Sequence, residues 1–268
     1  MSNFSRISSQ YEQDSIVQKS AGEILFGLLD IQPSDNVLDL GCGTGHISSL
    51  IKKHTSGNVV GVDQSVGMIK KAQEKYADLG LSFRNLSVEQ LDYKDEFEII
   101  FCNSVLQWFT QPDVALKNCY NALKYQGKMA VQAPATDNYC PNFIQAIEDV
   151  KRDKRTQQIF SGFNSPWLFF NSADDYQKIF EAAGFKVRES TIDRVKTSHS
   201  VEETVKIFSS GAAAGYLNQK YYTTRLTDHY LDAFKDIVRN SFQSQANESG
   251  NVELTFYRIY LLAEKIDT

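Results

Sequence analysis

A chain of 268 residues, of which 42% are hydrophobic and 12% aromatic, can bury a large core without disulfides or a structural metal. Its 28 basic and 33 acidic residues give a net charge of -5. This charge argues against binding to nucleic acid or to an anionic membrane, because both attract positively charged proteins. No stretch is apolar for long enough to cross a bilayer, and residues 1–10 lack the apolar core of a secretory signal. We therefore expect a globular protein whose partners are small molecules or other proteins.

The cysteines and histidines do not form the pattern of a disulfide framework or a metal site. Neither pairing nor metal-ligand spacing relates Cys42, Cys102, Cys119 and Cys140. The histidines are equally scattered, at His46, His54, His199 and His229. We interpret the cysteines as reduced thiols, which favours a cytoplasmic location. We expect no metal, and a zinc site is the weaker alternative.

The first part of the chain alternates helical and strand-like patterns. Apolar residues over 11–29 have the spacing of an amphipathic helix, and we predict that residues 1–30 form an N-terminal helix or lid. A short apolar run over 36–40 enters a glycine turn at 41–45, and helical spacing resumes over 46–54. This order predicts a strand, a tight turn and a helix.

A second buried strand is expected over 59–63, where it ends in an acid, and Ser65 is expected to cap a helix over 65–77. The alternation continues with expected strands over 81–86, 97–102 and 128–133 and an expected helix over 112–125. Strands that alternate with helices indicate an α/β fold with a doubly wound, mostly parallel sheet.

After Pro134 two long segments, 135–172 and 193–251, interrupt this rhythm, and we predict that these insertions form a helical cap. The further expected elements are helices over 143–152 and 173–183, a strand over 185–192, helices within 201–245 and a strand over 254–263. No repeat or linker divides the sequence, so residues 1–268 are predicted to form a single domain.

The glycine turn indicates a ligand site, because residues without a Cβ let the backbone approach a ligand closely. Its sequence is Gly41-Cys42-Gly43-Thr44-Gly45. Alone it is compatible with packing or with dinucleotide binding, but Asp63 at the end of the next strand is placed to accept both ribose hydroxyls of a nucleoside. The turn lacks the G-x-G-x-x-G spacing suited to a pyrophosphate, and Asp39 precedes it. The negative charge of Asp39 favours a ligand with cationic sulfonium and ammonium groups over a ligand with an anionic pyrophosphate.

Residues 37–45 resemble motif I of class I S-adenosylmethionine-dependent methyltransferases, and residues 61–65 with Met68 resemble their second motif. The resemblance implies a Rossmann-like methyltransferase fold, S-adenosylmethionine as cofactor and S-adenosylhomocysteine as product. It makes 34–134 the cofactor-binding core. The resemblance implies that four loop residues contact the methionine moiety of the cofactor: Gly41, Cys42, Gly43 and Gly45. It also implies that Asp39 supports either the loop or the ammonium group of the cofactor. By the same resemblance Asp63 binds the ribose hydroxyls, and Gln64 and Met68 flank the adenine.

The contact to the adenine amino group is the point where this sequence departs from the family. Relatives place an acid just after the third strand, where this chain has Ser87-Val88-Glu89. Either Ser87, a backbone group at Val88, or Glu89 in a shifted register makes that contact. Asn103 follows the next strand, at the edge where open α/β sheets bind ligands.

Three segments resemble a narrower group, the trans-aconitate 2-methyltransferases and malonyl-acyl-carrier-protein O-methyltransferases. They are Asn103-Ser104-Val105-Leu106-Gln107-Trp108, the N-terminal Tyr11-Glu12-Gln13 and the stretch over 250–263. The resemblance implies O-methylation of a small or carrier-bound carboxylate, with Tyr11 in a lid over the cofactor. A carboxylate acceptor needs no general base, which agrees with the lack of a catalytic His or Cys constellation. The alternatives are C- or N-methylation of another metabolite, or a non-catalytic module that binds the cofactor.

On the substrate side the candidates are Arg258, Gln107 and Trp108, each with a structural alternative. Arg258 either snorkels to solvent along its stem, which we favour slightly, or holds a substrate carboxylate, with Arg194 and Arg225 as fallbacks. Trp108 is equally compatible with the core, and Gln107 is expected to form hydrogen bonds near the cofactor. The aromatic cluster Phe160, Phe163, Trp167, Phe169 and Phe170 is interpreted as cap packing, and the charged run over 151–155 as a solvated helix face or a carrier-protein docking patch.

Overall fold

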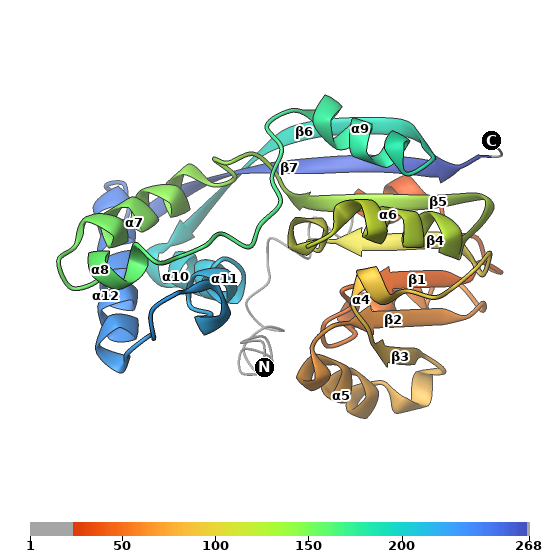
Figure 1. Cartoon of the computed structure of the whole chain (residues 1–268), viewed down its shortest axis with the longest axis horizontal. Coiled ribbons are helices and arrows are strands. Elements are labelled where there is room, and N and C mark those ends of the chain that lie inside the picture. Colours follow the sequence, from red (N-terminus) through yellow and green to blue (C-terminus); the bar gives the residue numbers. More distant parts are fainter. Residues whose placement is uncertain (1–23, 267–268) are drawn as a thin grey trace.

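The computed structural model describes residues 24–266 (Figure 1). Residues 24–29 are helical, so most of the helix expected over 11–29 lies outside the described residues. Tyr11 and the greater part of the N-terminal lid lie there too.

A seven-stranded sheet in the order β3-β2-β1-β4-β5-β7-β6 forms the centre of the molecule (Figure 1). The strands are β1 Val37–Leu40, β2 Val59–Asp63, β3 Ser82–Asn85, β4 Phe97–Asn103, β5 Leu123–Pro134, β6 Phe185–Ser200 and β7 Asn251–Lys265. Strands β1 to β5 pair in parallel, and β7 lies antiparallel between β5 and β6. The predicted doubly wound, mostly parallel sheet is confirmed.

Helices cover both faces of the sheet because neighbouring strand residues point to opposite sides. On one face, Leu38 of β1 packs in a core with α6 (Pro112–Ala122) and α9 (Ala173–Ala182). On the other, Val37 packs with helix 24–29 and α4 (His46–Ile51). Next to them α5 (Val66–Lys75) packs Ile69 and Ala72 against Phe83 of β3. The short helical turns are η1 Ala77–Leu79, η2 Val88–Gln90, η3 Leu106–Trp108 and η4 Gln219–Tyr221.

Local signals placed several element boundaries correctly. Ser65 caps α5 by accepting a hydrogen bond from the amide of Met68, as predicted. The strand expected over 59–63 has these bounds in β2. Helix α6 ends at Ala122, before the expected end at residue 125, because Leu123 already pairs with Phe97 of β4.

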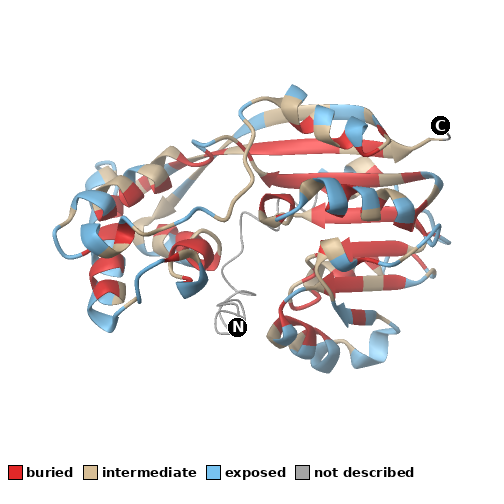
Figure 2. Ribbon diagram, in the orientation of Figure 1, coloured by how far each residue is buried: buried red, intermediate tan, exposed pale blue. Residues whose placement is uncertain are grey.

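A helical cap with a hydrophobic core of its own lies beside the sheet (Figures 1 and 2). Its helices are α7 Pro141–Arg152, α8 Gln157–Phe160, α10 Val201–Ser210, α11 Ala213–Tyr216 and α12 Asp228–Gln245. Val252, Leu254 and Phe256 of β7 complete this core. The long strands β6 and β7 therefore connect the cap to the main sheet, as Figure 1 shows.

Residues 193–200 form a strand, so the prediction that they begin the helical insertion is wrong. β6 continues to Ser200 and pairs with β7 from Asp193↔Arg258 to Ser200↔Asn251. This half of β6 lies at the edge of the sheet and alternates partly buried with exposed polar residues. It lacks the apolar run that marks an interior strand, and its pairing with β7 makes it a strand.

Candidate active site

The glycine turn after β1 holds the backbone in the left-handed region at Gly41, Gly43 and Gly45, with φ angles of 61°, 56° and 83°. At Gly41 a Cβ would also overlap the side chain of Val105, which follows β4. The chain therefore requires glycine at this position for two reasons, the φ angle and the close approach of the neighbouring loop. Gly45 immediately precedes α4, which begins at His46, as expected for that histidine.

Asp63 at the end of β2 connects two loops through its two carboxylate oxygens. One oxygen accepts a hydrogen bond from the amide of Gly43 over 3.0 Å, and the other accepts from the amide of Ser65 over 2.8 Å. Burial raises the pKa of Asp63, while these two amide donors lower it. The acid is thus held rigidly beside the glycine turn.

Asp39 lies behind the turn and is only 2% exposed. Its carboxylate accepts a hydrogen bond from the Ser48 hydroxyl over 2.6 Å. Burial raises the pKa of Asp39 to about 7, although the Ser48 hydroxyl lowers it, and the nearby charge of Asp63 raises it further. Asp39 therefore places a titratable charge under the loop and not at its surface.

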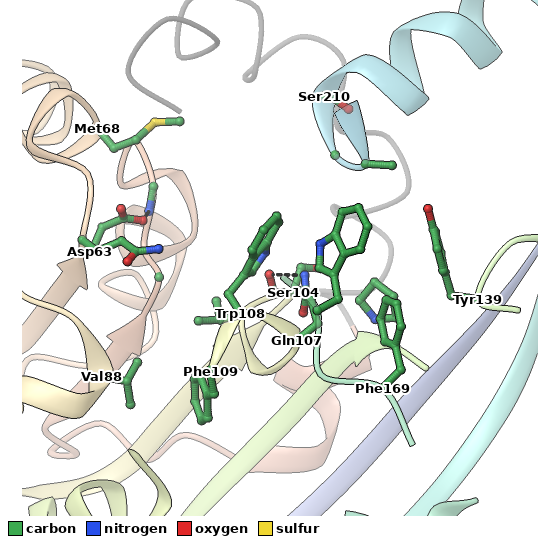
Figure 3. A pocket seen from close by; sticks show the side chains of 18 of the residues that line it. Asp63, Met68, Val88, Ser104, Gln107, Trp108, Phe109, Tyr139, Phe169 and Ser210 are labelled. Atoms are coloured by element: carbon green, nitrogen blue, oxygen red, sulfur yellow. Dashed lines mark hydrogen bonds between the residues drawn. The ribbon is translucent and has the colours of Figure 1, made fainter. Parts of the chain in front are cut away.

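A pocket opens at the carboxyl ends of β1, β2 and β4 and continues under the cap (Figure 3). The predicted site residues that line it are Gly41, Gly43, Asp63, Gln64, Met68, Ser87, Val88, Gln107, Trp108 and Arg258. In Figure 3 the labelled side chains run from Asp63 and Met68 through Ser104, Gln107 and Trp108 to Tyr139, Phe169 and Ser210. Asp39, Cys42, Gly45 and Asn103 lie outside this lining, and Tyr11 lies outside the described residues. The structure thus brings together candidates that are more than 200 residues apart in the chain.

The segment after β3 lines the pocket at the end where the adenine is expected. Ser87 begins η2 in a capping box with Gln90, whose side chain accepts from the Ser87 amide over 3.2 Å. Glu89 lines the pocket too, but one oxygen of its carboxylate accepts from the amide and the hydroxyl of Thr110, over 2.9 and 3.0 Å. This contact positions Glu89 against the loop that leads to α6.

The turn after β4 combines a strained backbone with an unsatisfied side chain. Ser104 has a φ of 60°, which is uncommon for a residue other than glycine. The Gln107 amide nitrogen donates to the Ser104 carbonyl over 2.9 Å (Figure 3), whereas its Oε1 is buried without a hydrogen-bond partner among the described residues. Strain and an unsatisfied acceptor that line a pocket are typical of functional sites.

Arg258 is buried, and the slightly favoured prediction that it snorkels to solvent is wrong. It is 6% exposed, lines the pocket and lies in register with Pro134 of β5. Its Nε and Nη1 have no hydrogen-bond partner among the described residues, and its guanidinium lies 5.2 Å from the centre of the Phe256 ring. Burial lowers its pKa to about 10. The fallbacks Arg194 and Arg225 are both exposed and do not line the pocket.

The expected aromatic cluster divides between the cap core and the pocket. Phe160 and Phe163 pack in the cap core, and Phe170 packs against the main core, whereas Trp167 and Phe169 line the pocket. Lining residues that the sequence analysis did not single out include Tyr139, Phe143, Ile207, Ser210 and Phe256. No local pattern marks them, since only the packing of the cap against β7 brings them into the lining of the pocket.

The charged run over 151–155 is largely paired within the cap. Lys151 forms an ion pair with Glu148, and Arg155 pairs with both Asp153 and Asp236. No group of His, Cys, Asp and Glu among residues 24–266 can hold a metal ion. In the same residues, no helix has the length and apolar character needed to span a bilayer.

The fold and the site define a nucleoside-binding protein of the doubly wound class, with its ligand at the carboxyl ends of the strands. A family model described as a methyltransferase domain matches residues 31–184, more than half of the chain. The chain belongs to this family of S-adenosylmethionine-dependent methyltransferases. The class recognised in the sequence is thereby confirmed.

Relatives of known name agree with the narrower resemblance. A malonyl-[acyl-carrier protein] O-methyltransferase of Haemophilus influenzae is 30% identical over 97% of this chain and 91% of its own length. One of Acetivibrio thermocellus is 26% identical over 48% of this chain and 46% of its own length. A trans-aconitate 2-methyltransferase of Deinococcus radiodurans is 30% identical over 48% and 50%. The chain thus spans about half the length of the last two relatives.

Solved structures of low identity share the fold. The YcgJ protein of Bacillus subtilis has a TM-score of 0.61 at 16% identity, covering 93% of this chain and 100% of that one. A phosphoethanolamine N-methyltransferase of Haemonchus contortus, solved with S-adenosylhomocysteine, has a TM-score of 0.56 at 14% identity, covering 92% of this chain and 53% of that one.

The residues present fit S-adenosylmethionine, the cofactor of this family. Gly41 and Gly43, whose backbone is in the left-handed region, line the pocket with backbone atoms that no side chain covers. Asp63 places a fixed carboxylate in the same lining, where it can accept hydrogen bonds from the ribose hydroxyls of the cofactor. Met68 and Val88 supply apolar surface for a flat base. The acids Asp39 and Asp63 make the surroundings of the turn suitable for a cationic ligand and unsuitable for a pyrophosphate.

Proposed function

We propose that this methyltransferase methylates a carboxylate oxygen of an acid whose negative charge is held by Arg258. The observation that carries the proposal is the guanidinium of Arg258, which lines the pocket while two of its nitrogens lack a partner among the described residues. An unpaired buried charge costs a fold several kcal/mol. A ligand carboxylate in the pocket removes this cost by forming charge-assisted hydrogen bonds with the guanidinium.

The residues at the other end of the pocket would hold the cofactor. We assign the backbone of Gly41 and Gly43 to the methionine moiety, Asp63 to the ribose hydroxyls, and Gln64, Met68 and Val88 to the adenine side. Asp39 contributes from behind the turn, through its charge and its bond to Ser48. When bound, S-adenosylmethionine supplies an electrophilic methyl group on a sulfonium.

The protein's part in such a transfer is alignment and the exclusion of water. A carboxylate is already a nucleophile at neutral pH, so no residue has to remove a proton from it. Trp108, Trp167 and Phe169 line the pocket and would exclude water from a bound acceptor, and Gln107 lines the same pocket with a buried, unsatisfied Oε1. Methylation of an amine or a carbon acid is less well supported, because the described lining contains neither histidine nor lysine.

The names of the relatives support the same chemistry. Malonyl-acyl-carrier-protein O-methyltransferases act, by their name, on a malonyl group attached to a carrier, and one such relative matches this chain along nearly its whole length. We therefore extend the proposal to small or carrier-bound carboxylates. A non-catalytic module would bind S-adenosylmethionine without transferring its methyl group, and this difference is directly measurable.

The experiment compares Arg258→Leu with Arg258→Lys and the wild type in a methyl-transfer assay with labelled S-adenosylmethionine and a panel of carboxylic acids. We expect Arg258→Leu to raise the KM for the acid by about tenfold or more, since a charge-assisted bond contributes roughly 1.5–3 kcal/mol, and Arg258→Lys to recover part of the loss. Cofactor affinity, measured by calorimetry, should be unchanged. Exposed Arg194→Leu is the control. Equal kinetics for wild type and Arg258→Leu, or an uncharged best acceptor, would reject the proposal.

A further inference from the structure

We infer, building on the proposed function, that the acceptor is a monocarboxylate with an apolar body, and that this body lies against the aromatic residues of the cap. The inference adds the substrate class to the proposed reaction. It rests on the distribution of charge in the pocket, on the apolar residues around Arg258 and on a second cavity behind them.

The charged side chains in the described lining of the pocket are Asp63, Glu89 and Arg258. The two acids follow β2 and β3, at the cofactor end, and Glu89 is tied to Thr110. Arg258 is therefore the single cation in the described lining of this pocket, and Lys151, which lines the second cavity described below, is paired with Glu148. A second carboxylate on the acceptor would lie either near these acids or against apolar side chains, and burying it unpaired would cost several kcal/mol.

The surroundings of Arg258 are aromatic and aliphatic. The aromatic and aliphatic side chains on the cap side of the pocket are Tyr139, Phe143, Trp167, Phe169, Ile207, Ala212 and Phe256, and Ser210 is the polar residue among them, its hydroxyl donating to the carbonyl of Ile207. Phe169 stacks on two of them, with ring centroids 5.3 Å from Tyr139 and 6.2 Å from Trp167, and the Tyr139 and Trp167 rings are 6.5 Å apart. Trp108 continues this wall toward Asp63 and the proposed cofactor end, and its ring centroid lies 5.8 Å from that of Trp167. Such a surface gains free energy by burying alkyl or aryl groups, whereas the polar groups of a polyacid would lose water there without replacement.

A second cavity lies behind three of these side chains. Tyr139, Trp167 and Phe169 line both the pocket and a cavity against α7. The apolar part of that cavity is formed by Ile144, Ile147, Phe160 and Phe163, and its polar part by Asp137, Glu148, Lys151, Gln157, Ser161 and Ser165. These three shared side chains form a partition between the two spaces. A long apolar acceptor would extend past the partition into the second cavity, where its alkyl chain would contact Ile144, Ile147, Phe160 and Phe163.

Two contacts hold Trp167 in the partition, one through the neighbouring backbone and one through its indole ring. The amide of the following residue, Leu168, donates to the carbonyl of Gln107 over 2.9 Å, which fixes the backbone to η3. The indole ring packs so closely on Gly215 of α11 that a Cβ there would overlap it. The position of Trp167 is therefore defined by the fold, and its size sets the depth of the first pocket.

The decisive experiment compares matched acids with the full chain and labelled S-adenosylmethionine. Decanoate and decanedioate have the same chain length and differ by the second carboxylate, and trans-aconitate and a malonyl thioester represent compact polar acids. We expect kcat/KM for decanoate to exceed that for each of the other three by at least tenfold. A preference for decanedioate, trans-aconitate or the malonyl thioester would overturn the inference and leave the proposed function intact. Cofactor binding without methylation of any acid would overturn both.

The variant Trp167→Ala tests the partition on an acid series from hexanoate to hexadecanoate. We expect the best chain length to increase by several carbons, because the removed indole connects the two cavities, while cofactor affinity stays within twofold of the wild type. Tyr125→Ala, which removes an exposed aromatic side chain far from the pocket lining, is the control and should keep the wild-type profile. An unchanged chain-length profile in a folded Trp167→Ala variant would contradict the role of the partition.

Discussion

The amide of Gly43 donates a hydrogen bond to the carboxylate of Asp63 over 3.0 Å, so the acid after β2 fixes the loop after β1. The two residues are 20 positions apart: Gly43 lies in the loop after β1, and Asp63 is the last residue of the neighbouring parallel strand β2. The second oxygen of Asp63 holds Ser65, the cap of α5. Removing this carboxylate therefore changes both a proposed ligand contact and the shape of the loops around it.

For Asp63→Ala we expect the affinity for S-adenosylmethionine to fall by an order of magnitude or more, equivalent to roughly 1.5–3 kcal/mol for one charge-assisted hydrogen bond. Isothermal titration of the folded variant measures this directly. Asp78→Ala removes an exposed acid of η1 and should bind like the wild type. An unchanged dissociation constant for Asp63→Ala would show that Asp63 does not bind the ribose.

A comparison of Gly41 with Gly80 separates two free-energy costs of adding a side chain, the cost of a positive φ angle and the cost of a steric overlap. Both have a positive φ, but a Cβ at Gly80 meets open space, whereas one at Gly41 overlaps Val105. We expect Gly80→Ala to lower the free energy of unfolding by about 1 kcal/mol and Gly41→Ala to lower it by roughly 2 kcal/mol more. The double variant Gly41→Ala/Val105→Ala should recover part of that difference in urea denaturation. Equal losses at the two glycines would contradict the close approach of Val105.

The raised pKa of Asp39, about 7, predicts a pH-dependent stability. Between about pH 4 and 7 the folded state keeps a proton that the unfolded state has released, so the free energy of unfolding falls as the pH rises. The contribution of Asp39 is about 1.4 kcal/mol for each pH unit in this window and is constant above it.

Asp39→Asn should remove this slope, because the amide oxygen still accepts from Ser48 but does not titrate. Urea denaturation of the cofactor-free protein at pH 5, 6, 7 and 8 measures the difference between wild type and variant. We expect the advantage of the wild type to decrease up to pH 7 and then to stay level. Parallel pH profiles for the two proteins would mean that Asp39 titrates near its ordinary value.

We expect Arg258→Met to keep or raise the stability of the fold while it weakens the binding of the acceptor acid. Replacing a buried, unpaired cation by an apolar side chain of similar length removes a desolvation cost, so the cofactor-free variant should be at least as stable as the wild type and up to a few kcal/mol more stable. Thermal unfolding without acceptor measures this, with exposed Arg194→Met as the near-neutral control. A strongly destabilised Arg258→Met would indicate that Arg258 stabilises the fold itself and is not held for a ligand.

The features that could be predicted from the sequence are those with local causes. β2 is a short apolar run closed by an acid, and Ser65 caps the helix that follows within three residues. The glycine turn is also local, because each glycine sits where the backbone must be left-handed. These signals indicated several residues that the structure brings together in the lining of one pocket, among them Gly41, Gly43 and Asp63.

The substrate end depends on contacts between distant parts of the chain, which no local pattern reveals. In its own strand Arg258 resembles a surface residue, but it is buried, and it lines the same pocket as the cap residues Tyr139 and Phe143, more than 110 positions earlier. The second half of β6 was missed for the same reason, since its strand structure depends on pairing with β7, about 60 positions later.

The position of β7 also determines when this protein can fold during its synthesis. β7 follows every other described element in the chain, yet it lies inside the sheet between β5 and β6. It gives Val252, Leu254 and Phe256 to the cap core and Ile259, Leu261 and Ala263 to the main core. A nascent chain without β7 therefore has two open cores and an unpaired edge on β5, which exposes it to aggregation. Both cores and the pocket are completed together, once the ribosome has released this strand.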